Sequence, residues 1–414
     1  MLRRWFAITL WKRILGALLV GIVVGFVLGE NAEAIGWVGT LFIRLIRMLV
    51  VPLIFFTLVA GVVALGDPAK LGSIGLKTFG LYLATTFFAL IIGLTVAVVF
   101  RPGAGVDIPQ DKSQELAEAQ GLTERLLTIV PENPAEALAT GDVLSIIFFA
   151  ILLGIGILLI GERGRPIADI MDSGAEVMIR IVHLIMEVAP FGVLALVAVL
   201  VGTGGVEALI DVLGLALVVY GGCLVHILLV HGAIMCFVLK LPPLRFFQGA
   251  LDAQLVAFST SSSSATLPVT MSVAEDNLGV SKPVASSVLP LGSTINMDGT
   301  ALYVGIVAVF TAQALGLDLA PADYGIIALT TTLVSIGTAA VPSASLFLLA
   351  GVLTTIGIPE ASIGFVVGFL LAFDRPLDMM RTLVNVTGDL SVATAVAKWE
   401  GELDEASFRA PPVE

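Results

Sequence analysis

The densest group of polar residues in this apolar chain lies near its C-terminus. Its members recur at spacings of three and four residues, which places them on one face of a helix. They are Asp374, Asp378, Arg381, Thr382, Asn385 and Asp389. An ionised group at bilayer depth costs about 2.5 to 3.5 kcal/mol, so this face must point to a polar cavity, to bound ions or to a partner.

The charges in this group do not balance. Three aspartates against Arg375 and Arg381 leave a negative excess, and a buried excess requires a cation that the chain itself does not supply. The group therefore predicts bound metal ions or protons. Asp378 and Arg381 are equally compatible with a structural ion pair that only fixes helix packing.

A second polar group interrupts an apolar run between Gly292 and Thr300. Asn296 and Asp298, together with the glycines, favour local unwinding of a helix, which frees backbone carbonyls. Oxygen ligands of this type suit a hard cation such as sodium. The alternative is a glycine kink with a hydrogen-bonded asparagine.

The serine run from Ser261 to Ser264 is typical of a flexible turn by composition alone. Inside a membrane hairpin, however, backbone N–H groups at helix N-termini form a ready site for a carboxylate.

Two further sets of polar residues have simpler explanations. Tyr82, Thr85 and Thr86 form a small patch whose hydroxyls would ordinarily bond back to their own helix. The histidines show no metal-ligand spacing, and we expect them to be packed or interfacial. They are His183, His226 and His231.

The elements that position these groups must lie in lipid, because 57% of the residues are hydrophobic and only 13% are charged. Apolar windows of roughly 20 residues recur along the whole chain and do not alternate in polarity, which predicts membrane-spanning helices and excludes a barrel. In the first part of the chain they lie near 14–29, 37–66, 79–100, 143–161, 167–201 and 206–238. The first run has no cleavage site after it, so we interpret it as a retained helix.

Charges in the connections predict the orientation. Lys or Arg occurs in the connections at 67–77, 162–165 and 240–245, whereas eight acidic residues face three basic ones between Arg101 and Asp142. Counted from a cytoplasmic N-terminus, the basic connections are all inside and the acidic loop is outside, as the positive-inside rule predicts. We expect the protein to span the cell (inner) membrane with both termini in the cytoplasm.

The pattern changes beyond residue 244. Two apolar segments, at 257–268 and 335–345, are broken at their centres by small polar residues and proline, which predicts helix–turn–helix hairpins. Apolar helices near 284–314 and 360–397 follow them in turn. The order hairpin, helix, hairpin, helix is typical of an inverted repeat that builds a binding site near the membrane midplane.

Three motifs, Ser262–Pro268, Asn296–Thr300 and Asp378–Asp389, resemble the signatures of the dicarboxylate/amino acid:cation symporters, the glutamate transporter family. The resemblance covers nearly the whole chain. It implies an all-α polytopic membrane protein with eight transmembrane helices, two re-entrant hairpins, a homotrimeric assembly and an elevator mechanism gated by the second hairpin. It also implies a scaffold at 1–75 and 141–203, a transport domain at 76–140 and 204–400, and a cytoplasmic tail at 401–414.

The same resemblance implies roles for individual residues. Asp378 and Thr382 would hold the substrate ammonium, Arg381 and Thr300 its side-chain carboxylate, and Asn385 with the Ser263 backbone its α-carboxylate. Ser262, Val341 and Ser345 would complete the substrate site. Three cation sites are implied: one with Gly292, Asn296, Asn385 and Asp389; one with carbonyls of Thr294, Ser335, Ile336 and Thr338; and one with Tyr82, Thr85, Thr86, Asn296 and Asp298.

The chain also departs from the family pattern. Archaeal and animal members carry an arginine where Ser261 and Met379 stand here, and Arg375 is the candidate replacement. Proton-coupled animal relatives have a glutamate where this chain has Val304, which favours sodium coupling. Ala340, Ser343 and Ser345 replace common glycines in the second hairpin, so a stiffer gate is expected.

The sequence therefore predicts a secondary active symporter that imports aspartate or glutamate with sodium ions, with membrane lipid around it. No enzymatic activity, organic cofactor or nucleic-acid partner is expected. The alternatives are a C4-dicarboxylate symporter of the same fold and a proton-coupled glutamate/aspartate transporter. An anion conductance at the domain interface stays open. An intramembrane protease is disfavoured, since the chain has no Gly-x-Ser-x-Gly and no histidine near the serine run.

Overall fold

A computed structural model of the protein describes residues 8–64, 68–106, 127, 130–336, 344–358, 360–371 and 373–412. These residues form helices joined by short turns, and no strand occurs among them, so the predicted all-α class is confirmed for this part of the chain. The elements are α2 (Leu10–Leu28), η1 (Gly29–Ile35), α3 (Gly36–Ala64), α4 (Pro68–Phe100), α6 (Pro134–Thr140), α7 (Val143–Leu159), η2 (Gly161–Gly164), α8 (Arg165–Met186), α9 (Ala189–His226), η3 (Ile227–His231), η4 (Ile234–Val238), α10 (Pro243–Thr260), α11 (Ser263–Ser272), η5 (Val273–Asn277), α12 (Lys282–Ile295), α13 (Asp298–Ala314), α14 (Pro321–Ile336), α15 (Ala344–Thr355), α16 (Glu360–Leu371), α17 (Asp374–Glu400) and α18 (Glu405–Arg409).

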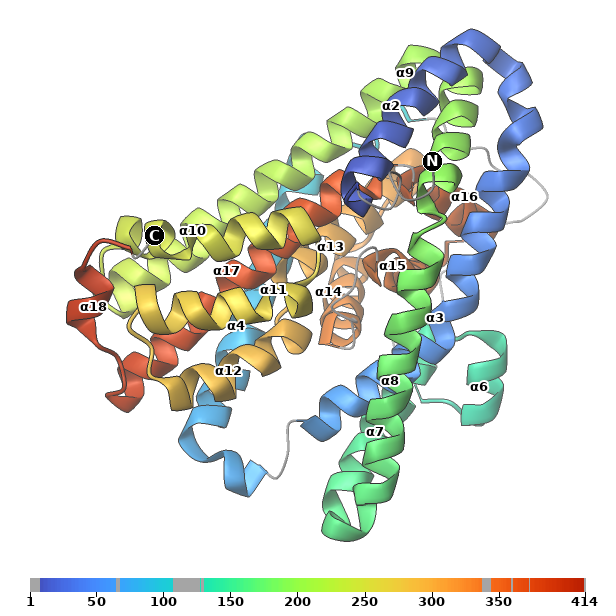
Figure 1. The fold of residues 1–414 in the computed structure, drawn as a ribbon. Helices are drawn as coiled ribbons and strands as arrows, with labels where there is room; N and C mark the ends of the chain where they lie inside the picture. The colour runs from blue at the N-terminus through green and yellow to red at the C-terminus, as the bar shows by residue number, and fades with distance from the viewer. Residues whose placement is uncertain are drawn as a thin grey trace.

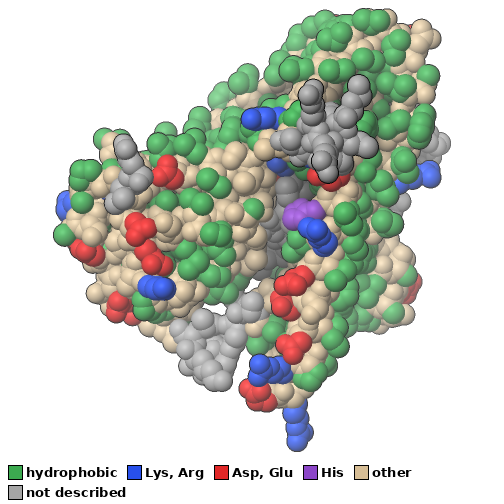
Figure 2. All heavy atoms as spheres, viewed as in Figure 1, with side chains coloured by type: hydrophobic (Ala, Val, Ile, Leu, Met, Phe, Trp, Pro, Cys, Tyr) green, Lys and Arg blue, Asp and Glu red, His purple; other side chains and the backbone are tan. Residues whose placement is uncertain are grey.

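Five helical stretches of the described chain are long and apolar enough to cross a membrane. They are Leu10–Val63, Gly72–Phe100, Ala189–Glu207, Leu209–Val238 and Lys282–Ala314. Hydrophobic side chains cover much of the visible surface in Figure 2, which a membrane protein requires and a soluble one avoids. The fold is thus that of a polytopic membrane protein, whereas the number of eight spans stays a prediction.

The apolar run at 167–201 is not one helix. Helix α8 ends at Met186, and α9 begins at Ala189 with Pro190 in its first turn, a position that proline favours. Helix α9 then bends sharply at Gly205, whose φ of 64° places it in the left-handed region. This bend falls between the two apolar runs expected at 167–201 and 206–238.

Both long helices expected in the second half are divided in the structure. The run at 284–314 becomes α12 and α13, which are separated by Asn296 and Met297, so the expected unwinding is confirmed. The run at 360–397 becomes α16 and α17, with the non-helical Phe373 directly before α17. This second division was not expected from the sequence.

The first predicted hairpin is present. Helices α10 and α11 pack against each other, and the chain reverses at Ser261, which adopts a left-handed φ of 54°. The Ser262 side chain then caps α11 by accepting a hydrogen bond from the Ala265 N–H. Helices α14 and α15 also pack together as the second hairpin requires, but its tip at 337–343 lies outside the described residues.

Two groups of helices are visible in Figure 1. Helix α3 packs against α7, α8 and α9 in one group, whereas α17 packs against α10, α12 and α13 in the other. Helix α4 joins the second group through α13, and α9 contacts both groups along its length. This packing is compatible with a division into a scaffold and a transport domain, which stays a prediction.

Candidate functional site

The polar face of α17 is buried in the helical bundle. All six of its expected members are at most 7% exposed. The residues come together because their spacing of three and four places them on one side of a helix that is surrounded by other helices. The prediction that this face points away from lipid is therefore confirmed.

Arg381 is the largest fully buried side chain of the described protein. Its Nη2 donates to Asp374 Oδ1 at 2.9 Å and to Asp378 Oδ1 at 2.8 Å. Its guanidinium carbon also lies 4.0 Å from the centre of the Tyr303 ring, a cation–π arrangement. The arginine thus has two carboxylate partners from its own helix, of which only Asp378 was expected.

The break between α12 and α13 packs directly on α17. The Gly299 N–H donates to Asn385 Oδ1 at 2.8 Å, and a Cβ on Gly299 would collide with the Arg381 carbonyl. Thr300, one residue farther, is buried beside this contact. Thr382 donates its hydroxyl to the Asp378 carbonyl of its own helix. Glycine at 299 therefore lets the broken helix approach α17 closely enough to share polar groups with it.

One expected cation cluster is brought together. Asn296 Nδ2 donates to Asp389 Oδ1 at 2.9 Å and lies 3.3 Å from the Asn385 carbonyl. Gly292 faces the same point, because a Cβ there would overlap both Asp389 Oδ1 and the Tyr82 hydroxyl. The four residues of this expected site thus lie around one buried position rich in oxygen.

The hydroxyl patch of α4 also reaches across to the broken helix. Thr86 donates to Asp298 Oδ1 at 2.7 Å, and Thr85 lies 3.4 Å from Asn296 Oδ1. The Tyr82 hydroxyl donates to the Val288 carbonyl at 3.1 Å. The expectation that these hydroxyls bond only to their own helix is wrong for Tyr82 and Thr86, because their partners lie on α12 and α13. The Thr85 hydroxyl contacts Asn296 and also bonds back to its own helix, at the Tyr82 carbonyl.

The remaining expected cation site is only partly described. Thr294 lies on α12 and Ser335 and Ile336 end α14, and these two helices contact each other. The hydroxyls of Thr294 and Ser335 donate to carbonyls of their own helices. Thr338, like the substrate-site residue Val341, lies outside the described residues.

The hairpin tip carries buried serines and a contact to α17. Ser261, Ser262 and Ser263 are all buried, and Ser345 is buried at the start of α15. Arg375 Nη2 donates to the Thr260 carbonyl at 3.1 Å, so its charge lies next to Ser261. Arg375 of α17 therefore places its positive charge at the tip of the first hairpin.

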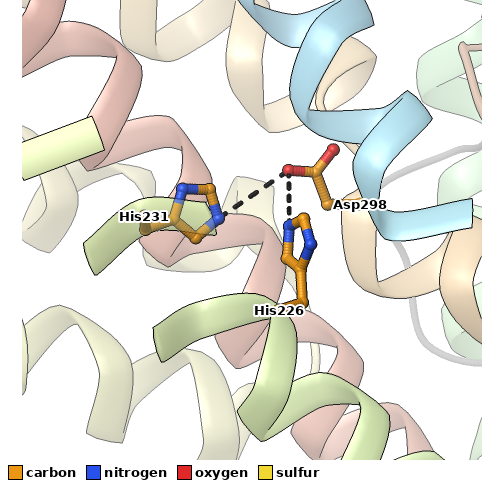
Figure 3. Close-up of side chains that lie close together, drawn as sticks. All are labelled: His226, His231 and Asp298. Atoms are coloured by element: carbon orange, nitrogen blue, oxygen red, sulfur yellow. Dashed lines mark hydrogen bonds and ion pairs between the residues drawn. The ribbon is translucent and has the colours of Figure 1, made fainter. Parts of the chain in front are cut away.

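Sequence reasoning missed the two histidines beside Asp298. His226 and His231 are both fully buried, and both imidazoles point to the same carboxylate oxygen (Figure 3). A signal was present, because residues 212–239 contain these two histidines but no Asp, Glu, Lys or Arg. Polar groups in such a span are expensive and mark functional positions.

Comparison with known proteins gives one consistent result. Residues 10–399 match the model of the sodium:dicarboxylate symporter family. The chain is 38% identical to the proton/sodium-glutamate symport protein of Bacillus caldotenax, with 95% of each chain covered. It is 35% identical to the proton/glutamate-aspartate symporter of Escherichia coli, with 95% of this chain and 93% of that one covered. It is 34% identical to the C4-dicarboxylate transport protein of Rhodopseudomonas palustris, with 97% and 91% covered.

Proposed function

The chain belongs to the sodium:dicarboxylate symporter family, and on this premise we propose that it imports aspartate or glutamate together with sodium ions. The family consists of membrane symporters and is not a class of enzymes. The observation that carries the proposal is the buried contact of Arg381 with Asp378, directly beside the break between α12 and α13.

An acidic amino acid matches the charges at this contact. Its ammonium group pairs with Asp378, and its side-chain carboxylate pairs with the guanidinium of Arg381. The substrate can therefore replace the Arg381–Asp378 contact by two new ion pairs, and its α-carboxylate would be held by the polar groups of Asn385 and the Ser263 backbone. Asp374 continues to hold Arg381 in the exchange.

Other solutes leave a charge unpaired at the same place. A C4-dicarboxylate has no ammonium group for Asp378 and would meet its negative charge. A neutral amino acid offers nothing to Arg381 beyond what Asp374 already supplies. An unpaired buried charge costs several kcal/mol, so both classes should bind more weakly than aspartate or glutamate.

Sodium is the proposed coupling ion because the oxygen-rich clusters suit a hard cation. Asp389 with Asn296 forms one cluster, and Asp298 with Thr86 forms another. Val304 fills the position at which proton-coupled animal relatives carry a glutamate, and the Bacillus caldotenax relative is named for both ions. We therefore assign the clusters to sodium rather than to protons.

The proposal includes the assembly and motion of the family. The chain would form a homotrimer in the cell membrane with both termini in the cytoplasm. Residues 76–140 and 204–400 would move as one body against the scaffold of 1–75 and 141–203, with the second hairpin as the gate. The separate packing of α3, α7 and α8 on one side and of α10, α12 and α17 on the other supports this division (Figure 1).

Transport by purified protein in proteoliposomes tests the proposal. Uptake of labelled aspartate, glutamate and succinate is measured while sodium and proton gradients are imposed separately. We expect aspartate or glutamate to accumulate only with an inward sodium gradient and succinate not to accumulate. Uptake driven by a pH gradient alone would assign the coupling to protons instead.

A C4-dicarboxylate symporter is the second candidate, because a relative that is 34% identical carries that name. The same assay separates the two functions. Sodium-driven accumulation of succinate in preference to both amino acids would favour this candidate and would contradict the role given to Asp378.

A further inference from the structure

The pair of histidines on the sixth apolar run forms a buried cluster with Asp298 (Figure 3). His226 Nε2 lies 3.3 Å from Asp298 Oδ2, and His231 Nε2 lies 3.8 Å from the same atom. All three side chains are fully buried. Neither ring nitrogen of His231 has a hydrogen-bond partner among the described residues, and His226 Nδ1 has none either. Buried ring nitrogens without a hydrogen-bond partner are rare in proteins and require an explanation.

A π-helical turn after α9 brings the two imidazoles together. In an α-helix, residues five apart point about 140° away from each other, so His226 and His231 would not share a face. Here Ile227–His231 forms a π-helical turn, which places fifth neighbours one above the other. The rings lie edge to face with their centres 4.9 Å apart. Short π-turns within α-helices occur frequently at functional sites.

We propose that His226, His231 and Asp298 form a binding site for a divalent transition-metal ion of the zinc type. Two imidazole nitrogens and one carboxylate oxygen are a donor set that zinc prefers and sodium does not. The three donor atoms lie within 4.8 Å of one another. Donors of a tetrahedral zinc site are about 3.4 Å apart, which His226 already matches and His231 approaches.

The surroundings of Asp298 fit this assignment. Thr86 binds the other carboxylate oxygen, Oδ1, so Oδ2 is directed to the two imidazoles. Gly388 of α17 borders the cluster, because a Cβ there would come within 3.2 Å of Asp298 Oδ2 and 3.4 Å of the His231 ring. The glycine thus leaves space beside the donors that a side chain would fill. A bond between a metal ion and the His231 imidazole would also give His231 Nε2 the partner that it lacks among the described residues.

The site shares Asp298 with one of the proposed sodium clusters. A divalent ion bound to Oδ2 would place two positive charges beside that cluster and weaken its binding of sodium, so it would act as an inhibitor of transport. The metal site itself does not depend on the proposed function; only the competition with sodium does.

Binding of Co²⁺, whose visible absorption reports four-coordinate geometry, tests the site. Full-length protein without a polyhistidine tag is titrated with Co²⁺ in a sodium-free choline buffer, and Zn²⁺ is then added to displace it. We expect one ion per protomer and displacement by Zn²⁺. His226→Gln and His231→Gln should each weaken Co²⁺ binding at least about 100-fold, because loss of even an outer partner of a ligand costs 10- to 100-fold.

Two further variants make the test decisive. His183→Gln is the matched control, because His183 is exposed on α8, and it should bind Co²⁺ like the native protein. His231→Cys should retain binding and add a thiolate-to-metal absorption band that places residue 231 at the ion even where the Gln variants fold poorly. The proposal is overturned by absence of Co²⁺ binding to the native protein, or by binding that His226→Gln and His231→Gln leave unchanged.

Sodium is then added to the Co²⁺-loaded protein as a separate measurement. We expect sodium to weaken Co²⁺ binding through the shared Asp298. If Co²⁺ binds through the histidines but sodium has no effect on it, the metal site stands and the assignment of a sodium ion to Asp298 fails.

Discussion

Arg381 has an unusual environment, since it is fully buried, lies over the Tyr303 ring and binds two carboxylates of its own helix. Its planar guanidinium can donate two parallel hydrogen bonds to a substrate carboxylate, a geometry that lysine cannot reproduce. A purely structural role and a substrate-binding role make different predictions for the variants of this pair.

Arg381→Cys should abolish uptake of acidic amino acids and admit serine, alanine or cysteine, whose side chains need no counter-charge. The measurement is a competition panel of acidic and neutral amino acids against variant protein that elutes at the same size as the native protein. Arg163→Cys on the exposed η2 turn is the control for an added thiol and should change nothing. If the variant still preferred aspartate over serine, Arg381 would have only a structural role in helix packing.

Asp378→Ser should weaken aspartate binding at least tenfold, because a charge-assisted hydrogen bond contributes roughly 1.5 to 3 kcal/mol. Isothermal calorimetry with aspartate measures the change, and succinate is tested in parallel because the variant no longer repels it. Asp252→Ser, on an exposed position of α10, is the matched control. Unchanged aspartate affinity would mean that the amino group is bound elsewhere.

Asp389→Asn should raise the sodium concentration for half-maximal uptake about tenfold or more. The change removes the negative charge of Asp389, whose Oδ1 accepts a hydrogen bond from Asn296 within the proposed cation cluster. The sodium dependence of aspartate uptake is the measurement, with Asp318→Asn, an exposed aspartate after α13, as the control. A sodium dependence like that of the native protein would remove Asp389 from the cation site.

At the scale of helices, the break between α12 and α13 was predictable and the π-turn was not. Asn, Asp and Gly together weaken a helix by local chemistry, and Asn296 and Met297 are indeed non-helical. The serine run likewise marked the hairpin tip, because a left-handed residue and an N-cap serine are local features. The pairing of His226 with His231 depends instead on a π-turn, which packs against α17 and has no local signature in the sequence.

The starts of α9 and α17 show that a long apolar run can hide a helix boundary. Pro190 was an available signal for the start of α9, although the apolar run continues through that point. The division at Phe373 had a comparable signal after it, because Asp374 and Pro376 lie in the first turn of α17. The proximity of Thr86 to Asp298 was expected through the family resemblance, whereas the contact of His226 with Asp298 required the three-dimensional arrangement.

Gly292→Ala should lower the apparent affinity for sodium about tenfold, because the new methyl group overlaps Asp389 Oδ1 and the Tyr82 hydroxyl. Overpacking of this kind costs about 1 to 3 kcal/mol. The measurement is the sodium dependence of aspartate uptake. Gly221→Ala is the matched control, because it makes the same change in an apolar helix with open space beside it. Equal effects of the two variants would show that only helix propensity had changed.

At the scale of the whole molecule, the C-terminal segment closes one end of the second helical group. The Asp404 N–H donates to the Gly279 carbonyl, and the Ser281 N–H donates to the Glu402 carbonyl. Phe408 of α18 is fully buried in the core that α10, η5 and α12 share. The segment thus links the first hairpin to the end of α17.

Phe408→Ala should destabilise the protein by about 3 to 5 kcal/mol, because it leaves a cavity in a packed core. A lower thermal unfolding temperature of the purified protein in detergent is the expected result. Phe237→Ala is the control, because that side chain is 78% exposed on the apolar surface and should have little effect. An unchanged unfolding temperature for Phe408→Ala would mean that the C-terminal segment contributes nothing to the stability of the bundle.

The burial of α17 has a consequence for biosynthesis. This helix contains Asp374, Arg375, Asp378, Arg381, Asp389, Lys398 and Glu400, and it is absent from the five stretches that are apolar enough to cross a membrane. Each charge at the bilayer centre costs about 2.5 to 3.5 kcal/mol during insertion, so the nascent helix cannot partition into lipid alone. Its insertion therefore requires polar partners, which in the folded protein come from the helices that pack against it, α4, α10, α12 and α13. The helix that carries the proposed substrate site is therefore also the one whose insertion depends most on its protein neighbours.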